Sequence, residues 1–346
     1  MGRMNYKALV PLALAAVIAF AQPVVFIAQE VGKAADILAA TRKAIGDKKL
    51  DGLKTFSLQS SLQRNVQSMQ IGADVEILLD LPDKYLRSEV AGSPGGGGMV
   101  MVAGGGVTGF NGDRPLQKAM TGGVPGGHGG MVIRMGGPAG SLPDGSGQKP
   151  TAEQLEQMNK ALVRSSQSEA SRLMLGWFAM AHPSINAQYT LAGEAESPDG
   201  KAWVIDVKNA DNFAARLFID QQTHLPLMVT YKGPQPRMMS AGGGARQVAP
   251  AGGGGGGHTV TMNASMTEEE RKKAQADIEK QIQEMQKQPP VMIDYTVFFD
   301  EWRDADGVKF PFKMRRAMGS ETTEEWTVSK VKLNPKIDPK RFTGDS

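Results

Sequence analysis

The sequence contains no cysteine in 346 residues, and only 6% of its residues are aromatic. Without cysteine the chain can form no disulfide and cannot carry a lipid on an N-terminal cysteine. Excess charge of one sign is also missing, because the net charge is +3 and Lys and Arg are interleaved with Asp and Glu. This balance excludes nucleic acid as an expected partner.

Sequence patterns for catalysis are missing too. None of the four histidines stands in a His-x-x-x-His pattern, and neither a G-x-S-x-G nor a P-loop motif occurs. His182 precedes Pro183, and we interpret it as a capping cation at a helix end. Glu324 and Glu325 are adjacent in an expected strand and point to opposite faces, so we interpret both as surface residues. We therefore predict no enzymatic activity, no catalytic residue, no cofactor and no metal.

Methionines gather around two of the histidines, His128 and His258. Thioether and imidazole groups suit Cu(I), which makes copper handling an alternative. Methionine is also the common filler of apolar cavities, and mobile loops do not preset ligand geometry. The residue pattern therefore favours no metal site.

The first residues have the order of a signal peptide. Arg3 and Lys7 precede an apolar run from Ala8 to Ala21, which is too short to span a bilayer. Small residues at the end of this run predict cleavage after Ala21, with Ala28 as a second choice; an uncleaved anchor is the alternative. Either way we expect the rest of the chain outside the cytoplasm, in the periplasm or an equivalent compartment, and peripheral to a membrane at most.

Glycine is distributed unevenly along the chain. Of 42 glycines, 21 fall between Gly92 and Gly147 and another 10 between Gly233 and Gly257. Glycine loses the most backbone entropy on ordering, and these stretches offer few apolar side chains in return. We therefore predict two disordered, low-complexity insertions, at 92–147 and 233–258, within a single domain over residues 30–346.

Outside the insertions, apolar and polar residues alternate with the period of a half-buried strand. The clearest case is Ile71, Ala73, Val75, Ile77, Leu79 and Leu81. Turn signals separate such runs, and the strongest hairpin signals are Asp199-Gly200 and Asp306-Gly307. Further turns are expected at Pro82-Asp83, Asn111-Gly112 and His224-Leu225-Pro226. The pattern predicts about eleven strands.

Three segments have helical periodicity instead. Val31, Ala34, Leu38, Thr41 and Ile45 predict a short amphipathic helix that stops near Gly46. Thr151 and Gln154 form a capping box for a second helix, expected to run up to Pro183. Thr267 and Glu270 form another capping box, and a narrow apolar stripe predicts an inserted, half-exposed helix at 267–288.

The order of these motifs resembles the outer-membrane lipoprotein-sorting proteins of the LolA/LolB-like fold, over about two thirds of the chain after the signal. The resemblance rests on a strand from Phe56, the stretch from Pro82 to Arg87, Gly109-Phe110-Asn111-Gly112, Leu217-Phe218-Ile219-Asp220 with Leu225-Pro226-Leu227, Asp306-Gly307-Val308-Lys309-Phe310-Pro311, and Asn334-Pro335 through Asp338-Pro339 with Phe342. It implies a mainly β (α+β) fold: a curved, unclosed antiparallel sheet with helices over its concave face and an apolar cavity for acyl chains. The glycine-rich insertions, and Leu116 where the family often has an aromatic residue, depart from this pattern.

We expect the concave face to bind acyl chains of a lipid or lipoprotein, since burial contributes about 0.8 kcal/mol per methylene. The alternative is a non-enzymatic scaffold on the same fold that contacts an envelope protein partner. The residues predicted to line the apolar cavity are Phe56, Leu58, Val75, Ile77, Leu79, Trp203, Ile205, Tyr295, Val297, Phe299, Phe310, Phe312 and Trp326.

Overall fold

The structure is a computed structural model. It describes residues 23–66, 69–91, 106–119, 151–197, 200–235 and 289–343. The predicted signal peptide, the helix expected at 267–288 and most of the two glycine-rich stretches lie outside these residues.

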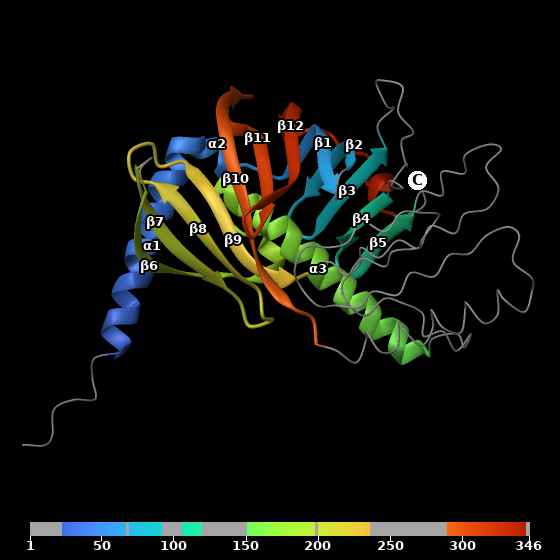
Figure 1. The fold of residues 1–346 in the computed structure, drawn as a ribbon, viewed down its shortest axis with the longest axis horizontal. Coiled ribbons are helices and arrows are strands. Elements are labelled where there is room, and N and C mark those ends of the chain that lie inside the picture. The colour runs from blue at the N-terminus through green and yellow to red at the C-terminus, as the bar shows by residue number, and fades with distance from the viewer. Residues whose placement is uncertain are drawn as a thin grey trace, which may run out of the picture.

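The described strands form one open antiparallel sheet, in the order β5-β4-β3-β2-β1-β12-β11-β10-β9-β8-β7-β6. Placing β12 between β1 and β11 joins the two halves of the chain at the centre of the sheet. Figure 1 shows the sheet curving, with β5 and β6 as its edges. The strands are β1 (Thr55–Val66), β2 (Met69–Asp80), β3 (Lys84–Ala91), β4 (Gly106–Asn111), β5 (Arg114–Ala119), β6 (Gln188–Ser197), β7 (Gly200–Lys208), β8 (Ala214–Asp220), β9 (Pro226–Pro234), β10 (Met292–Ala305), β11 (Val308–Met318) and β12 (Glu321–Leu333).

The predicted turns connect these strands because their residues supply the required backbone angles. Asp306 and Gly307 have φ values of 57° and 75° between the paired residues Ala305 and Val308. Two successive positive φ angles are what a tight two-residue hairpin needs. At the β4–β5 turn, Gly112 has a φ of 61°. The β6–β7 hairpin closes on the pair Ser197 and Gly200, while Asp199 itself lies outside the described residues.

In the described residues, three α-helices and two short 3-10 helices accompany the sheet: α1 (Pro23–Ile45), α2 (Lys48–Asp51), α3 (Ala152–Phe178), η1 (Pro183–Ile185) and η2 (Pro339–Phe342). The face predicted for α1 is largely the buried one, since Ala34, Leu38, Thr41 and Ile45 are buried and only Val31 is exposed. Both helices α1 and α3 contribute to one core cluster with the sheet, so they cover the same face. We call this buried side of the sheet the concave face.

Helix α3 begins as predicted and ends earlier than predicted. The Thr151 hydroxyl accepts from the Gln154 backbone N–H at 3.2 Å, and the Gln154 side chain accepts from the Thr151 N–H at 2.8 Å. The helix stops at Phe178 rather than at Pro183, because Ala179 adopts a left-handed conformation with a φ of 52°. Nothing in the local sequence marks that position, since alanine usually favours a helix.

The opposite face of the sheet carries a small second core. Leu78, Leu86 and Leu116 pack there with Phe342 of η2. In β2 the period of two puts Leu78 on the same face as Asp74, Glu76 and Asp80, which by itself predicts a solvent-exposed side chain. It is only 3% exposed, because the C-terminal segment folds back over it.

The predicted fold class, an unclosed antiparallel sheet with helices on its concave face, is confirmed by the structure. The sheet has twelve described strands, against about eleven expected. Two of them, β4 and β5, lie inside the range predicted for the first insertion, so residues 106–119 belong to the sheet. The division into one domain with insertions stays a prediction.

Candidate binding face

Most of the residues predicted to line a cavity lie together on the concave face. Ten of the thirteen are at most 5% exposed. They are Phe56, Leu58, Val75, Ile77, Leu79, Ile205, Val297, Phe299, Phe310 and Trp326. We call these ten residues the apolar layer.

The C-terminal half of α3 covers the apolar layer. The ring of Phe56 lies 5.4 Å from that of Trp177, 5.2 Å from that of Phe178 and 5.6 Å from that of Phe310, measured between centroids. The indole N–H of Trp177 donates to the sulfur of Met314 at 3.1 Å. The layer is therefore closed by a helix.

Gly176 permits this close approach of helix to sheet. A Cβ atom at position 176 would lie 1.8 Å from Cζ of Phe299, well inside the van der Waals distance. The helix backbone can rest on the aromatic ring only because residue 176 has no side chain.

The other three predicted residues, Trp203, Tyr295 and Phe312, are half-buried. Trp203 stacks on His224 with a centroid distance of 5.1 Å. Tyr295 stacks on Tyr231 at 5.2 Å, with 10° between the ring planes. The guanidinium of Arg303 lies 5.1 Å from the ring centroid of Phe312. All three rings are thus engaged with other side chains.

Two surface pockets lie away from the apolar layer. One, of about 370 Å³, is lined by residues that include Arg42, Leu50, Pro82 and Met180 near α2. The other lies along Lys330–Lys336 beside Asp306. None of the thirteen predicted residues lines either pocket.

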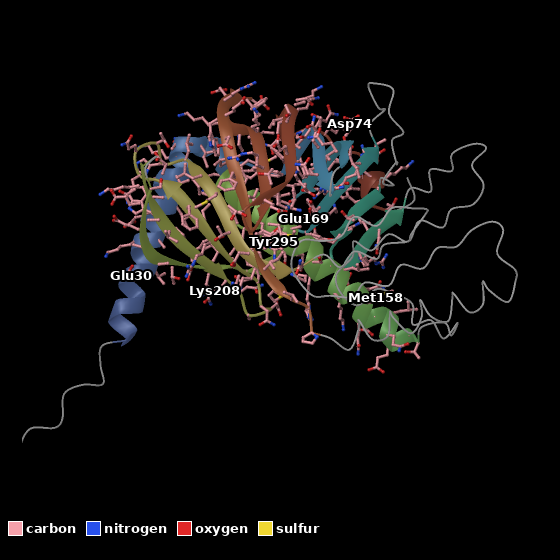
Figure 2. The ribbon with its side chains drawn as sticks, in the orientation of Figure 1. Glu30, Asp74, Met158, Glu169, Lys208 and Tyr295 are labelled. Atoms are coloured by element: carbon pink, nitrogen blue, oxygen red, sulfur yellow. The ribbon has the colours of Figure 1, made fainter. Side chains whose placement is uncertain are left out.

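A group of buried and half-buried charges borders the apolar layer, and we call it the charged band. Glu169 of α3 pairs with Arg87 of β3, whose guanidinium lies 2.5 Å from Glu89. Arg64 lies 3.3 Å from Glu89 and 2.9 Å from Glu324. Its members are Arg64, Arg87, Glu89, Glu169, Arg172, Arg316 and Glu324. Figure 2 labels Glu169 of α3 and Tyr295 of β10 in the central region where α3 crosses the sheet.

Burial and charge act against each other in this band. Burial alone would raise the pKa of Glu324, but the positive charges of Arg316, Arg87 and Arg64 outweigh it and lower the pKa to about 2. Burial would lower the pKa of Arg87, yet the neighbouring carboxylates, Glu169 first among them, raise it. Both groups are therefore charged at neutral pH.

The charged band lies at one end of the strands. Arg64, Glu89 and Arg316 each stand two residues from the end of β1, β3 and β11. Adjacent strands of the sheet are antiparallel, so β3, β5 and β9 all end on this side. The chain therefore leaves the sheet here in the β3–β4 and β9–β10 connections and in the connection from β5 to α3. They contain the two glycine-rich stretches, so we call it the insertion end.

The expectation for Glu324 was wrong, and that for His182 was correct in part, because its side chain caps η1 by accepting from the Ser184 N–H. Glu324 is only 7% exposed, because the period of two puts it on the same face as Trp326. Arg87 and Glu89 likewise follow Tyr85 at even spacing in β3, and this alternation is the signal that reveals the band. His182 is 1% exposed, and burial lowers its pKa to about 4, so it is neutral rather than a cation.

The described residues contain no group of three or more His, Asp or Glu that could hold a metal ion. Nor does any helix in the described ranges have the length and apolar character to cross a membrane.

No protein-family model matches the chain, and no curated protein matches its sequence. Among solved structures it is similar to a LolA superfamily protein from Nitrosomonas europaea (10% identity, TM-score 0.42) and to a domain described as an outer-membrane lipoprotein-sorting protein from Vibrio parahaemolyticus (10%, 0.45). A DUF1329 family protein from Desulfovibrio piger is similar at 8% identity and a TM-score of 0.40. Each likeness covers 90% of this chain and 97% of the other.

The chain is thus similar in fold to structures described as LolA-like or lipoprotein-sorting. At these identities the likeness concerns the fold alone, and a LolA-like sheet by itself assigns no ligand.

Proposed function

We propose that the protein is a non-enzymatic, extracytoplasmic carrier that holds acyl chains of a lipid or lipoprotein against the apolar layer. The observation that carries this proposal is that one helix, α3, covers a continuous apolar sheet face. Its buried residues begin at Val163, so its first turns do not help to close the layer. Figure 1 shows α3 running from beside β4 and β5 to a position behind β9 and β10.

An acyl chain can replace the helix at little net cost in free energy. The buried apolar side chains at the end of α3 are Leu173, Met174, Leu175, Trp177 and Phe178. Burying each contributes about 1.5–3 kcal/mol, or roughly 8–15 kcal/mol together. A sixteen-carbon acyl chain buried on the same surface contributes about 12 kcal/mol at 0.8 kcal/mol per methylene. The two contributions are of equal order, so cargo and helix can compete for the apolar layer.

The ion pair between Glu169 and Arg87 is the polar contact that holds the middle of α3 to the sheet. If α3 must leave the layer, removing this pair should favour the open form. The tested variant is Glu169→Gln. The matched control is Glu156→Gln on the exposed first half of the same helix, where Glu156 pairs with the exposed Lys160.

The experiment titrates delipidated protein with an uncharged apolar fluorescent probe. We expect saturable binding by the wild type, displacement by phospholipid or a lipopeptide, and a several-fold gain in affinity for Glu169→Gln but not for Glu156→Gln. Circular dichroism confirms that each variant is folded. Native mass spectrometry of protein from its own envelope should show co-purifying lipid.

A folded wild-type protein that binds no probe and carries no lipid would refute the carrier. The scaffold that contacts an envelope protein would then take its place.

A further inference from the structure

Arg172 of α3 is a half-buried cation that forms no ion pair with a described residue. Its guanidinium lies 4.0 Å from the ring centroid of Tyr231 and 5.7 Å from that of Phe213. The side chain is half-buried, and its Nε atom is fully buried without a hydrogen-bond partner. Across the described ranges of the chain, no carboxylate lies within ion-pair distance of it.

The other members of the charged band are already matched. Glu169 and Glu89 pair with Arg87, and Glu324 is shared between Arg64 and Arg316, at 2.9 and 3.3 Å. Four arginines therefore face three carboxylates, which leaves one positive charge in excess. Burial lowers the pKa of Arg172, and the charge of Arg316 adds to this effect, while Tyr231 and the carboxylate of Glu169 oppose it without reversing it.

Arg172 cannot remove this excess positive charge by losing a proton, because the ordinary pKa of arginine is above about 12. The face of Tyr231 provides a cation–π contact but accepts none of the five guanidinium N–H groups in the plane where they point. A bound oxyanion supplies both the missing charge and the missing acceptors. An oxyanion could thus accept a hydrogen bond from the unpaired Nε–H of Arg172 and balance its charge.

The aromatic support under Arg172 is fixed in place. Tyr231 is stacked on Tyr295, whose hydroxyl donates to the Pro234 carbonyl at 2.9 Å. A Cβ at Gly233 would lie 2.9 Å from the Tyr295 ring, so glycine leaves room for this stack. The guanidinium therefore rests on a preorganised surface at the insertion end.

We propose that Arg172, supported by Tyr231 and with Arg316 nearby, binds an oxyanion, the carboxylate or phosphate at the head of an amphiphile whose acyl chain lies on the apolar layer. Arg172 is one helical turn from Gly176, where α3 meets Phe299 of that layer. A head group on Arg172 would place the first methylenes of its chain beside the layer. This inference extends the proposed carrier function and rests on it for the acyl part alone.

The test compares ligands with one chain and different heads: oleate with oleyl alcohol, and phosphatidic acid with diacylglycerol. The variants are Arg172→Met, which keeps the length and removes the charge, and Arg172→Lys, which keeps the charge. The control is Arg164→Met, an exposed arginine eight residues earlier on α3. Inorganic phosphate, followed through the melting temperature, tests the anion site without any acyl chain.

We expect the wild type and Arg164→Met to bind the acids at least about tenfold more tightly than their neutral partners. Arg172→Met should lose this preference while keeping its affinity for the neutral partners, and Arg172→Lys should retain part of it. The melting temperature of Arg172→Met without ligand should not fall, because this substitution removes a charge that has no ion-pair partner. Phosphate should raise the melting temperature of the wild type and not that of Arg172→Met.

Equal affinity for acid and neutral ligands, unchanged in a folded Arg172→Met protein, overturns the anion site and leaves the carrier standing. If no amphiphile binds but phosphate stabilises the protein through Arg172, the carrier fails and the anion site stands. A response to phosphate that survives in Arg172→Met shows an adventitious ion only and also overturns the site.

Discussion

Glu324 is the carboxylate on which the charged band depends, because Arg64 and Arg316 both pair with it. Removing one partner from a buried ion pair leaves an uncompensated charge and costs about 3–5 kcal/mol. We predict that Glu324→Gln lowers the free energy of unfolding by this amount, with a fall in melting temperature of roughly ten degrees. Glu325→Gln, on the exposed neighbour, should change it by less than about 0.5 kcal/mol. Equal effects of the two variants in denaturant titrations would contradict the role given to Glu324.

His182 gives the protein a pH dependence at the single-residue scale. Burial lowers its pKa from 6.5 to about 4 in the folded state, so the unfolded chain binds more protons between these values. Stability is therefore fully present above about pH 6.5 and is lost as the pH falls toward 4, by roughly 3 kcal/mol. His182→Asn should remove this part of the slope, since an amide oxygen can accept from Ser184 N–H as Nδ1 does at 3.3 Å.

The measurement is the free energy of unfolding between pH 4 and 7 for both proteins. Carboxylates with lowered pKa, such as Glu324, contribute a slope at lower pH and are the same in both. Identical slopes for wild type and His182→Asn would show that His182 is not the titrating group.

At the scale of the element, the contact of α3 with β10 passes through Gly176. We predict that Gly176→Ala destabilises the protein by at least about 1 kcal/mol, because overpacking against Phe299 costs about 1–3 kcal/mol and exceeds the helix propensity of alanine. Gly32→Ala is the matched control, since no atom lies within 4 Å of a Cβ built at Gly32 in α1. There the substitution should stabilise by about 0.5–1 kcal/mol.

Thermal unfolding of the two variants decides between packing and propensity. A stabilising Gly176→Ala would mean that α3 does not rest on the sheet as described.

Elements whose signal is local could be predicted from the sequence. Asp306 and Gly307 adopt the positive φ angles of a tight turn as these residue types readily do, and Thr151 and Gln154 form their capping hydrogen bonds with each other. The end of α3 could not be predicted, because Ala179 is left-handed for tertiary reasons. Leu78 was misplaced because η2, more than 250 residues later, covers it. The charged band was not predicted, because a charged residue type such as Glu324 indicates a surface position. Its place in the alternation, on the same face as Trp326, indicates burial instead.

At the scale of the whole molecule, local sequence patterns predict the apolar layer, whereas the helix that covers it is determined by long-range packing. Alternation identifies which side chains share a face, and ten of the thirteen predicted residues are buried, while their role in binding acyl chains stays a prediction. Which element closes that face depends on where α3 docks, which is a long-range property. The layer is covered by α3 with Gly176 at the contact, and the pockets lie elsewhere. A carrier function therefore requires α3 to exchange with its cargo.

The β9–β10 connection tests how far the sheet depends on the inserted sequence. Pro234 pairs with Met292, and the Gln235 N–H donates to the Val291 carbonyl at 2.8 Å, so the two strands stay together up to the insertion. We predict that replacing residues 237–288 with a four-residue turn leaves the sheet intact. Closure entropy grows only with the logarithm of loop length, so the shorter loop should stabilise the protein by about 2 kcal/mol at most. The melting temperature should stay level or rise. A fall of more than about ten degrees, or roughly 3 kcal/mol, would show that the replaced segment contributes packing that the sheet needs.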